Sequence, residues 1–253
     1  MPYPTTEDEA FETICWSADV DTEDELNAIL DTVPQLRYVK IDRLGVAKMG
    51  HDVIDRTQAR GLHVFDDAKL IEIPTKLEEL AKFEVAHHPW MLNCMAGSLS
   101  NQDWSNPDRK RLDGLKRFAD TCNEAGVLSC AVTVLTSKAE DTVLHEFGRG
   151  SKDQVCFYTE VLIYAGFTDM VCSPLEAQTI QDEFGDYAPD RNCPGVEMPG
   201  GKSSDQARKA TPSQALHNGA KRLVIGRALT GPNAAANLQA IVDHILAGIP
   251  QTD

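Results

Sequence analysis

The sequence predicts a single (β/α)8 barrel, also called a TIM barrel, that spans residues 1–253. Short apolar runs alternate with longer amphipathic stretches from one end of the chain to the other. No Pro/Ser-rich linker and no change in composition divides the chain. Its 253 residues are close to the usual length of such a barrel. Strands that alternate with helical connections in this way indicate a closed barrel rather than an open doubly wound sheet.

The predicted strands are runs of about four to eight apolar and β-branched residues bounded by turn residues, which is typical of strands buried on both faces. In chain order they are Thr13–Val20, Arg37–Asp42, Leu62–Lys69, Pro89–Ala96, Leu128–Leu135, Asp169–Ser173, a weak run at Asn192–Val196, and Arg222–Leu229.

The predicted helices have apolar residues at helical spacing and charges on the opposite side. Thr211 is a favourable N-cap, and Pro212 follows it at the first helical position. The predicted helices are Glu23–Thr32, Gly50–Arg60, Lys76–Ala86, Arg109–Glu124, Pro212–Gly219 and Asn233–Leu246.

Composition and charge exclude several classes of partner. The net charge of −15 argues against a general nucleic-acid-binding surface and against docking to an anionic membrane. An anionic substrate would therefore need a local group of cations or backbone amides. No apolar run approaches the roughly 18 residues of a membrane span, and the polar, acidic start has no signal-peptide pattern. We expect residues 1–10 to be disordered or loosely packed.

Cysteine usage indicates a reducing compartment. The seven cysteines are odd in number and form no C-x-x-C pair, and several lie inside apolar runs (Cys15, Cys94, Cys130 and Cys172). We interpret them as reduced core residues of a cytoplasmic protein.

Polar residues recur where the predicted strands end. In a (β/α)8 barrel the carboxyl ends of the strands and the following loops carry the chemistry. A single charged residue there is usually a solvated loop residue, but chance does not readily place polar residues at the end of nearly every strand. The set comprises Asp19, Lys40, Asp67, Lys69, Asn93, Thr136, the loop after Val196, and Gly226 with Arg227.

The third predicted strand carries the strongest local signal. Asp67 and Lys69 are two residues apart, so on a regular strand they point to the same side, into the barrel mouth. Lys40 should lie beside them, and Glu72 follows on the loop. Alternating lysines and carboxylates stabilise one another's charged forms. The alternative is a structural ion-pair network that closes the top of the barrel.

These residues resemble the motif D-x-K-x-x-D-I-P of the orotidine 5′-phosphate decarboxylase family. The chain reads D-A-K-L-I-E-I-P at residues 67–74, and further similar segments follow the family's order over nearly the whole chain. They are SADV (17–20), VKID (39–42), WMLNCMA (90–96), AVTVLTS (131–137), VCSPLEA (171–177), PGV (194–196) and VIGRALT (224–230).

The resemblance implies decarboxylation of orotidine 5′-phosphate to uridine 5′-phosphate in pyrimidine biosynthesis, without a metal or organic cofactor. The catalytic residues it implies are Lys40, Asp67, Lys69 and Glu72. The substrate-binding residues it implies are Asp19 and Lys40 for the ribose, Thr136 for the pyrimidine, and Pro194, Gly226 and Arg227 with loop 197–204 for the phosphate. Glu72 and Ile73 would reach into the partner's site, which implies a homodimer.

Five positions depart from the family pattern. The last aspartate of the motif is Glu72, and the family's threonine and histidine fall at Lys76 and Met95. An arginine and a glutamine of the phosphate loop fall at Glu197 and Pro199. A charge displaced by about 1 Å in a preorganised site can lower the rate on the order of 100-fold. Lys202 is a candidate for a compensating charge.

Two alternatives remain open. The first is a magnesium-dependent reaction such as that of keto-gulonate-phosphate decarboxylase or hexulose-phosphate synthase, which share the D-x-K-x-x-D core. The second is a nucleotide-binding barrel with impaired catalysis, suggested by the five departures. His87 and His88 come before the fourth strand, at the end of the barrel opposite the chemistry, so we predict no metal role for them.

Overall fold

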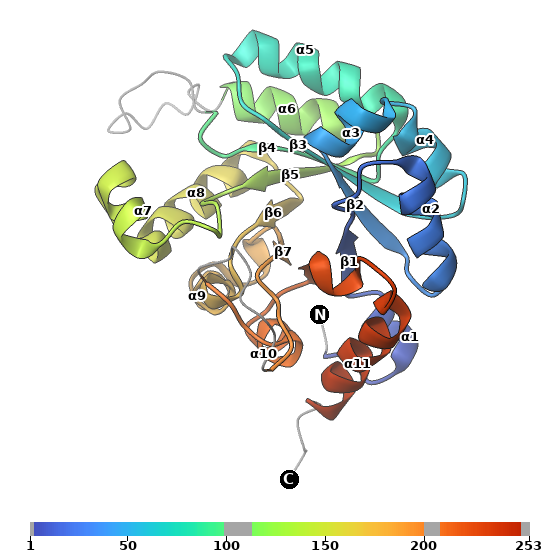
Figure 1. Ribbon diagram of the computed structural model, residues 1–253. Coiled ribbons are helices and arrows are strands. Elements are labelled where there is room, and N and C mark those ends of the chain that lie inside the picture. Colours follow the sequence, from blue (N-terminus) through green and yellow to red (C-terminus); the bar gives the residue numbers. More distant parts are fainter. Residues whose placement is uncertain (1–2, 99–112, 200–207, 249–253) are drawn as a thin grey trace.

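The eight strands form a closed parallel barrel, as the sequence predicts. The computed structural model describes residues 3–98, 113–199 and 208–248. Each strand pairs with the next, and β8 pairs with β1 to close the ring (Figure 1). The strands are β1 (Ile14–Ser17), β2 (Tyr38–Asp42), β3 (His63–Leu70), β4 (Met91–Met95), β5 (Leu128–Val132), β6 (Asp169–Val171), β7 (Asp190–Cys193) and β8 (Arg222–Ile225).

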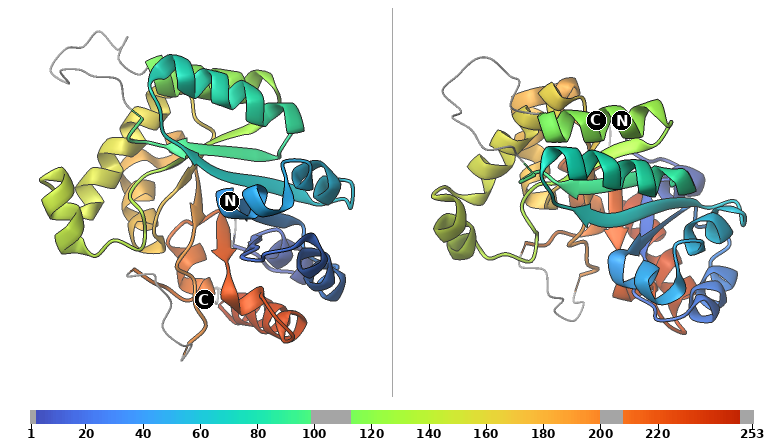
Figure 2. Two further views of the ribbon diagram at one scale, coloured as in Figure 1. Left: turned by 45° about the horizontal axis from the view of Figure 1, so that its top comes forward. Right: turned by 90° about the horizontal axis from the view of Figure 1, so that it is seen from above.

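Helices surround this barrel on its outer side (Figures 1 and 2). The α-helices are α1 (Glu7–Phe11), α2 (Glu23–Thr32), α3 (Arg43–Met49), α4 (Val53–Gln58), α5 (Pro74–Glu84), α6 (Asp113–Glu124), α7 (Glu140–Phe147), α8 (Ser151–Ala165), α9 (Pro174–Phe184), α10 (Pro212–His217) and α11 (Ala234–Ala247). Short 3₁₀ helices are η1 (Val85–His87), η3 (Gly185–Tyr187) and η4 (Arg227–Leu229).

Several predicted elements have different bounds in the structure; the first, fifth and eighth strands, for example, end earlier than predicted, at Ser17, Val132 and Ile225. The helix predicted over residues 50–60 is shorter, because Gly50 ends α3 with φ 83° and α4 starts only at Val53. The weak seventh strand starts earlier than predicted and ends at Cys193, since Gly195 adopts φ 81° and turns the chain. Residues 109–112 of the predicted helix 109–124 lie outside the described residues.

The N-terminal segment that we expect to be disordered or loosely packed contains a short capped helix, although residues 5–9 are exposed. The Tyr3 hydroxyl donates a hydrogen bond to the Ile245 carbonyl (2.8 Å). Thr6 and Glu9 form a capping box at the start of α1, and Ala10 is fully buried. The capping box and the packing of α1 against α11 outweigh the polar composition of the segment. Residues 1–2 lie outside the described part.

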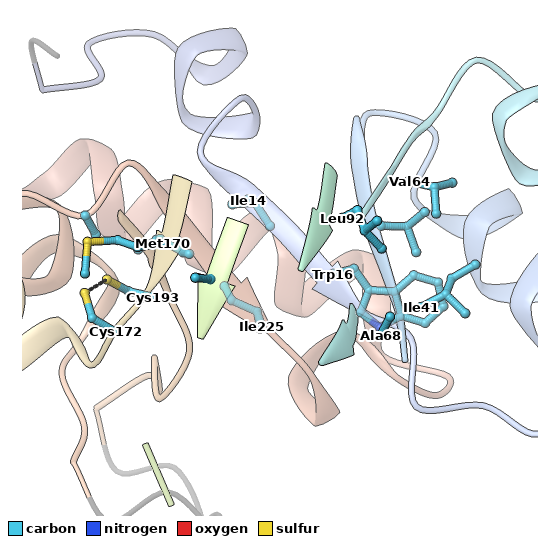
Figure 3. Packing of buried hydrophobic residues seen from close by; sticks show 14 of the residues in the cluster. Ile14, Trp16, Ile41, Val64, Ala68, Leu92, Met170, Cys172, Cys193 and Ile225 are labelled. Atoms are coloured by element: carbon cyan, nitrogen blue, oxygen red, sulfur yellow. Dashed lines mark hydrogen bonds between the residues drawn. The ribbon is translucent and has the colours of Figure 1, made fainter. Parts of the chain in front are cut away.

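The core has two layers because side chains alternate along each strand. Residues that point outward pack under the helices, and Figure 3 shows part of this layer, including Trp16, Ile41 and Leu92. A smaller apolar cluster fills the barrel interior and consists of Cys15, Phe65, Met91, Cys130 and Val224. All seven cysteines are free thiols, and six of them are buried.

The amino-terminal end of the barrel is filled by Arg222 at the start of β8. Its guanidinium lies 4.5 Å from the centroid of the Trp90 ring and 5.7 Å from that of Tyr38. It also donates a hydrogen bond to Oδ1 of Asp169 (2.9 Å). These contacts lie at the amino ends of β6 and β8.

Among the helices described in residues 3–98, 113–199 and 208–248, none is long and apolar enough to cross a membrane.

Candidate active site

Lys40, Asp67 and Lys69 meet at the carboxyl ends of β2 and β3, as the sequence predicts. The Nζ atoms of Lys40 and Lys69 each lie 2.5 Å from the same oxygen, Oδ2 of Asp67. The Asp67 side chain is 6% exposed and that of Lys40 12%, whereas that of Lys69 is 41% exposed. Asp67 is therefore a buried anion, and Lys69 stands at the rim of the barrel mouth.

Charge balance keeps this cluster ionised. Burial alone would raise the pKa of Asp67, but Lys40 and Lys69 outweigh it and lower the pKa below its usual value. Burial likewise opposes the charge of Lys40, but Asp67, helped by Asp19 and Asp42, raises its pKa. Asp67 thus stays a carboxylate and Lys40 an ammonium at neutral pH.

The local backbone differs from the regular strand that the prediction assumed. Asp66 pairs with Leu92, but the next pair is Leu70 with Cys94, so β3 bulges between them. Lys69 lies in this bulge with φ 47°. Asp67 and Lys69 do come together, but through a bulge and not through simple alternation. The sequence offers no signal for the bulge, because lysine rarely adopts positive φ.

The ends of β1 and β8 bring Asp19 beside Gly226. A Cβ atom added to Gly226 would lie 3.4 Å from Oδ2 of Asp19, so the carboxylate is within van der Waals distance of this glycine. Ser17 donates a long hydrogen bond to the other Asp19 oxygen (3.4 Å). Arg227 follows Gly226, begins η4 and is exposed.

The segments around Thr136 and Pro194 are held by residues that the sequence analysis missed. Arg208 is buried, forms an ion pair with Glu176 and donates a hydrogen bond to the carbonyl of Leu135 (3.1 Å), next to Thr136. Glu197 is one of the five residues that depart from the family pattern. Nζ of Lys209 lies 3.2 Å from its Oε2 and balances its negative charge. Lys202, the predicted compensating cation, lies outside the described residues, as does loop 200–207.

Glu72 and Ile73 do not join the cluster within this chain. Both are exposed, and Glu72 accepts a hydrogen bond from the amide of Ile73 (3.0 Å). Among the ion pairs of the described residues, Glu72 has none with Lys40 or Lys69. Ile73 is 65% exposed, and its apolar neighbour Ile71 is 63% exposed.

A second buried acidic group lies on the outer face of β3. Asp66 is 1% exposed, and its Oδ2 has no hydrogen-bond partner. Glu84 of α5, also 1% exposed, accepts from Arg43 (2.6 Å) and contacts the His51 ring (2.7 Å). Burial, then Glu84 and Asp67, raise the pKa of Asp66 to about 8 against the opposing effect of Arg43.

Within the described residues, the group with metal-ligand geometry is Asp52, Asp55 and His87, whose donor atoms lie within 4.8 Å of one another. Nδ1 of His87 lies 2.7 Å from Asp55. Asp52 and Asp55 lie at the start of α4, and His87 ends η1 before β4. Exposed acidic groups of this kind are common without a metal, and we assign it no role.

The comparisons with known proteins agree with the fold and the motif. The family model described as "Orotidine 5'-phosphate decarboxylase / HUMPS family" matches residues 12–241. The chain is 32% identical to the orotidine 5′-phosphate decarboxylase of Halorhodospira halophila over 217 residues, covering 85% of this chain and 87% of that protein. It is 28% identical to the enzyme of Staphylococcus aureus strain Newman over 222 residues, covering 84% and 88%.

Solved structures give the same fold. The orotidine 5′-phosphate decarboxylase of Lactobacillus acidophilus superimposes with a TM-score of 0.74 at 24% identity, covering 93% of this chain and 99% of that one. An uncharacterized conserved protein of Geobacillus kaustophilus does so with a TM-score of 0.72 at 21% identity, covering 92% and 99%. From the family match over most of its length, the chain belongs to the orotidine 5′-phosphate decarboxylase / HUMPS family.

Proposed function

We propose that the protein decarboxylates orotidine 5′-phosphate to uridine 5′-phosphate in pyrimidine biosynthesis, without a metal or organic cofactor. The observation that carries this proposal is the buried Asp67 carboxylate, held ionised between Lys40 and Lys69 at the barrel mouth. The family of the chain and its named decarboxylase relatives support the reaction class.

The substrate phosphate binds at Gly226 and Arg227, with Pro194 on the neighbouring segment. This assignment fits the phosphate sites that β/α barrels often form after their last two strands. Asp19, beside Gly226, and Lys40 bind the ribose hydroxyls, and Thr136 contacts the pyrimidine. Local cations are needed here because the protein carries a net charge of −15.

The chemistry then follows from the charges of the cluster. The substrate carboxylate is bound against the ionised Asp67, and this like-charge contact is relieved when the C6–carboxyl bond breaks and carbon dioxide leaves. The electron pair stays on C6, where the ammonium of Lys69 stabilises it. Lys69 then donates a proton to C6 and later regains one from water. Binding of the remote phosphate contributes to holding the two carboxylates together.

The active unit is a homodimer in which Glu72 and Ile73 complete the partner's site. Their exposure supports this, because large exposed apolar side chains that adjoin one another often mark an interface. Leu44, which follows β2, is 59% exposed and adds to Ile71 and Ile73, which follow β3. We place the protein in the cytoplasm, in keeping with its free cysteines.

The test is turnover of orotidine monophosphate by the purified protein, followed as loss of orotate absorbance, with and without EDTA. We expect turnover that EDTA does not affect, that Lys69→Ala abolishes and that Lys116→Ala leaves unchanged. Lys116 is a matched control because it pairs with Asp120 on the exposed face of α6.

Two outcomes would contradict the proposal. Turnover that EDTA abolishes would favour the magnesium-dependent reactions of the wider family. A folded protein that binds uridine monophosphate but does not turn over the substrate would favour a nucleotide-binding barrel.

A further inference from the structure

Asn93 of β4 lies opposite the bulge in β3 that carries Asp67 and Lys69. Between the pairs Asp66–Leu92 and Leu70–Cys94, β3 advances by four residues and β4 by two, so β3 holds two extra residues. Asn93 is the single β4 residue within this interval, and it is fully buried. The polar groups of the extra residues therefore need partners other than the regular strand pairing.

The Asn93 side chain supplies partners to both functional residues. Its Nδ2 donates a hydrogen bond to Oδ1 of Asp67 (2.7 Å), and its Oδ1 accepts one from the backbone amide of Lys69 (2.7 Å). With Lys40 and Lys69 on Oδ2, both oxygens of Asp67 are then held in place. One amide side chain thus fixes the orientation of the Asp67 carboxylate and the backbone from which Lys69 projects.

Energy considerations indicate that the bulge depends on this residue. The left-handed conformation of Lys69 (φ 47°) is unfavourable for a residue with a Cβ. Asn93 makes one hydrogen bond to a charged group, Asp67, and one to the backbone amide of Lys69 itself, and bonds to charged groups are the stronger kind. Both bonds oppose the strain at Lys69, because both are made only when β3 bulges at this point.

We propose that Asn93 is a positioning residue, which holds the β3 bulge so that the Lys69 ammonium and the Asp67 carboxylate face each other at the correct distance for the reaction. This inference rests on the proposed function for its kinetic readout. Asn93 acts through Asp67 and Lys69, so its loss should affect the chemical step rather than substrate affinity.

The first test is Asn93→Leu, which keeps the branched arrangement of four side-chain heavy atoms and removes both hydrogen bonds. We expect kcat to fall on the order of 10- to 100-fold, because a small misplacement of reacting groups has effects of that size. KM should change by less than about threefold, because the phosphate and ribose contacts lie on other strands. An unchanged kcat, or a loss confined to KM, would overturn the proposal.

The second test is Asn93→Asp, which separates positioning from a general effect on folding. As a carboxylate, the new side chain repels Asp67; when protonated, it can donate to Asp67 and accept from Lys69, as asparagine does. Burial and Asp67 should both raise its pKa. We expect the ratio of variant to wild-type kcat to rise about tenfold from about pH 8 to about pH 5, whereas a ratio independent of pH would contradict the proposal.

Asn192 provides the matched control. It is 1% exposed and donates to Asp169 (3.0 Å) beside Arg222, near the closed end of the barrel. Asn192→Leu and Asn192→Asp make the same chemical changes at another buried asparagine–aspartate pair. We expect them to lower stability without the kcat loss and without the pH-dependent ratio.

A readout in the free protein keeps the inference separate from the proposed function. Hydrogen exchange by NMR should show the Lys69 amide protected in the wild type and in Asn192→Leu, and fast in Asn93→Leu. If wild type fails to turn over orotidine monophosphate, the proposed function fails, and this exchange rate alone decides the role of Asn93. Equal protection in all three proteins would overturn it.

Discussion

Lys40 and Lys69 hold the same carboxylate oxygen from two different strands. Each Nζ lies 2.5 Å from Oδ2 of Asp67, but the Lys40 side chain is 12% exposed and that of Lys69 is 41% exposed. The two ion pairs are therefore equal in length and unequal in their exposure to solvent. This difference in exposure predicts that the two lysines contribute unequally to stability.

We expect Lys40→Met to destabilise the protein far more than Lys69→Met. Removing the buried cation should lower the free energy of unfolding by about 3 kcal/mol, since the buried Asp67 then keeps only the solvent-exposed Lys69 as its counter-charge. Removing the solvent-screened cation should lower it by less than about 1 kcal/mol. Both variants should lose turnover. Urea denaturation measures the difference, and equal losses of stability would refute this distinction.

Asp67→Asn should separate binding from turnover. The substitution removes the like-charge contact with the substrate carboxylate, so the affinity for orotidine monophosphate should increase while turnover is lost. Calorimetric titration with orotidine and uridine monophosphates measures both affinities. The gain should be confined to the carboxylated ligand; turnover that survives the substitution would show that Asp67 has another role.

Asp66 should make the free energy of unfolding depend on pH between pH 3.8 and about 8. The pKa of Asp66 rises from 3.8 to about 8 in the folded protein, so across this range the folded state retains a proton that the unfolded state releases. The contribution of Asp66 to stability therefore falls as the pH rises. Lys40 and Asp67 do not add to this slope above about pH 5, because the pKa of Asp67 is lowered and that of Lys40 is raised, so both groups are ionised in the folded and the unfolded state.

Asp66→Asn should accordingly stabilise the protein at neutral pH, on the order of 2–4 kcal/mol, and flatten this slope. Chemical denaturation of both proteins at several pH values measures the effect. The variant should have little effect near the acid end, where Asp66 is protonated in both states. A parallel slope in wild type and variant would assign the pH dependence to other groups.

Arg227→Ala should weaken binding of the substrate phosphate. The loss of a charge-assisted contact of about 1.5–3 kcal/mol corresponds to a rise in KM of roughly 10- to 100-fold. Turnover of the nucleoside orotidine, which lacks the phosphate, provides the control and should be unaffected. If the variant slows nucleoside turnover equally, Arg227 acts on the structure and not on the phosphate.

Subunit mixing tests the shared site. Lys69→Ala and Glu72→Ala homodimers should each be inactive, because every site lacks one residue. In a one-to-one mixture about half the dimers are hybrids with one intact site, so about one quarter of the wild-type activity should return. Light scattering checks that the protein is a dimer. No recovery after verified exchange would place Glu72 outside the partner's site.

The barrel can be predicted from the sequence because each strand is recognised from its own short run of residues. Buried parallel strands are continuous apolar runs, and a run such as Leu128–Leu135 is visible without knowledge of its neighbours. The sequence also contains a local signal for helix α1, since Thr6 and Glu9 are spaced as a capping box. The polar composition around them suggested disorder instead.

The finer features of the site could not be predicted, because they depend on which segments meet in space. Nothing near Lys69 in the sequence indicates its positive φ, which depends on Asn93 of the next strand. Asp66 looks like a second surface acid beside Asp67, and only the packing of β3 and α5 shows that it is buried next to Glu84.

The closed end of the barrel determines how ligands enter and leave. Arg222, stacked on Trp90 and bonded to Asp169, fills that end. In the proposed reaction, substrate and product nucleotides would share one route through the mouth at Lys69, so a bound uridine monophosphate would block the next substrate. The product should therefore inhibit competitively, and carbon dioxide should depart before the nucleotide does.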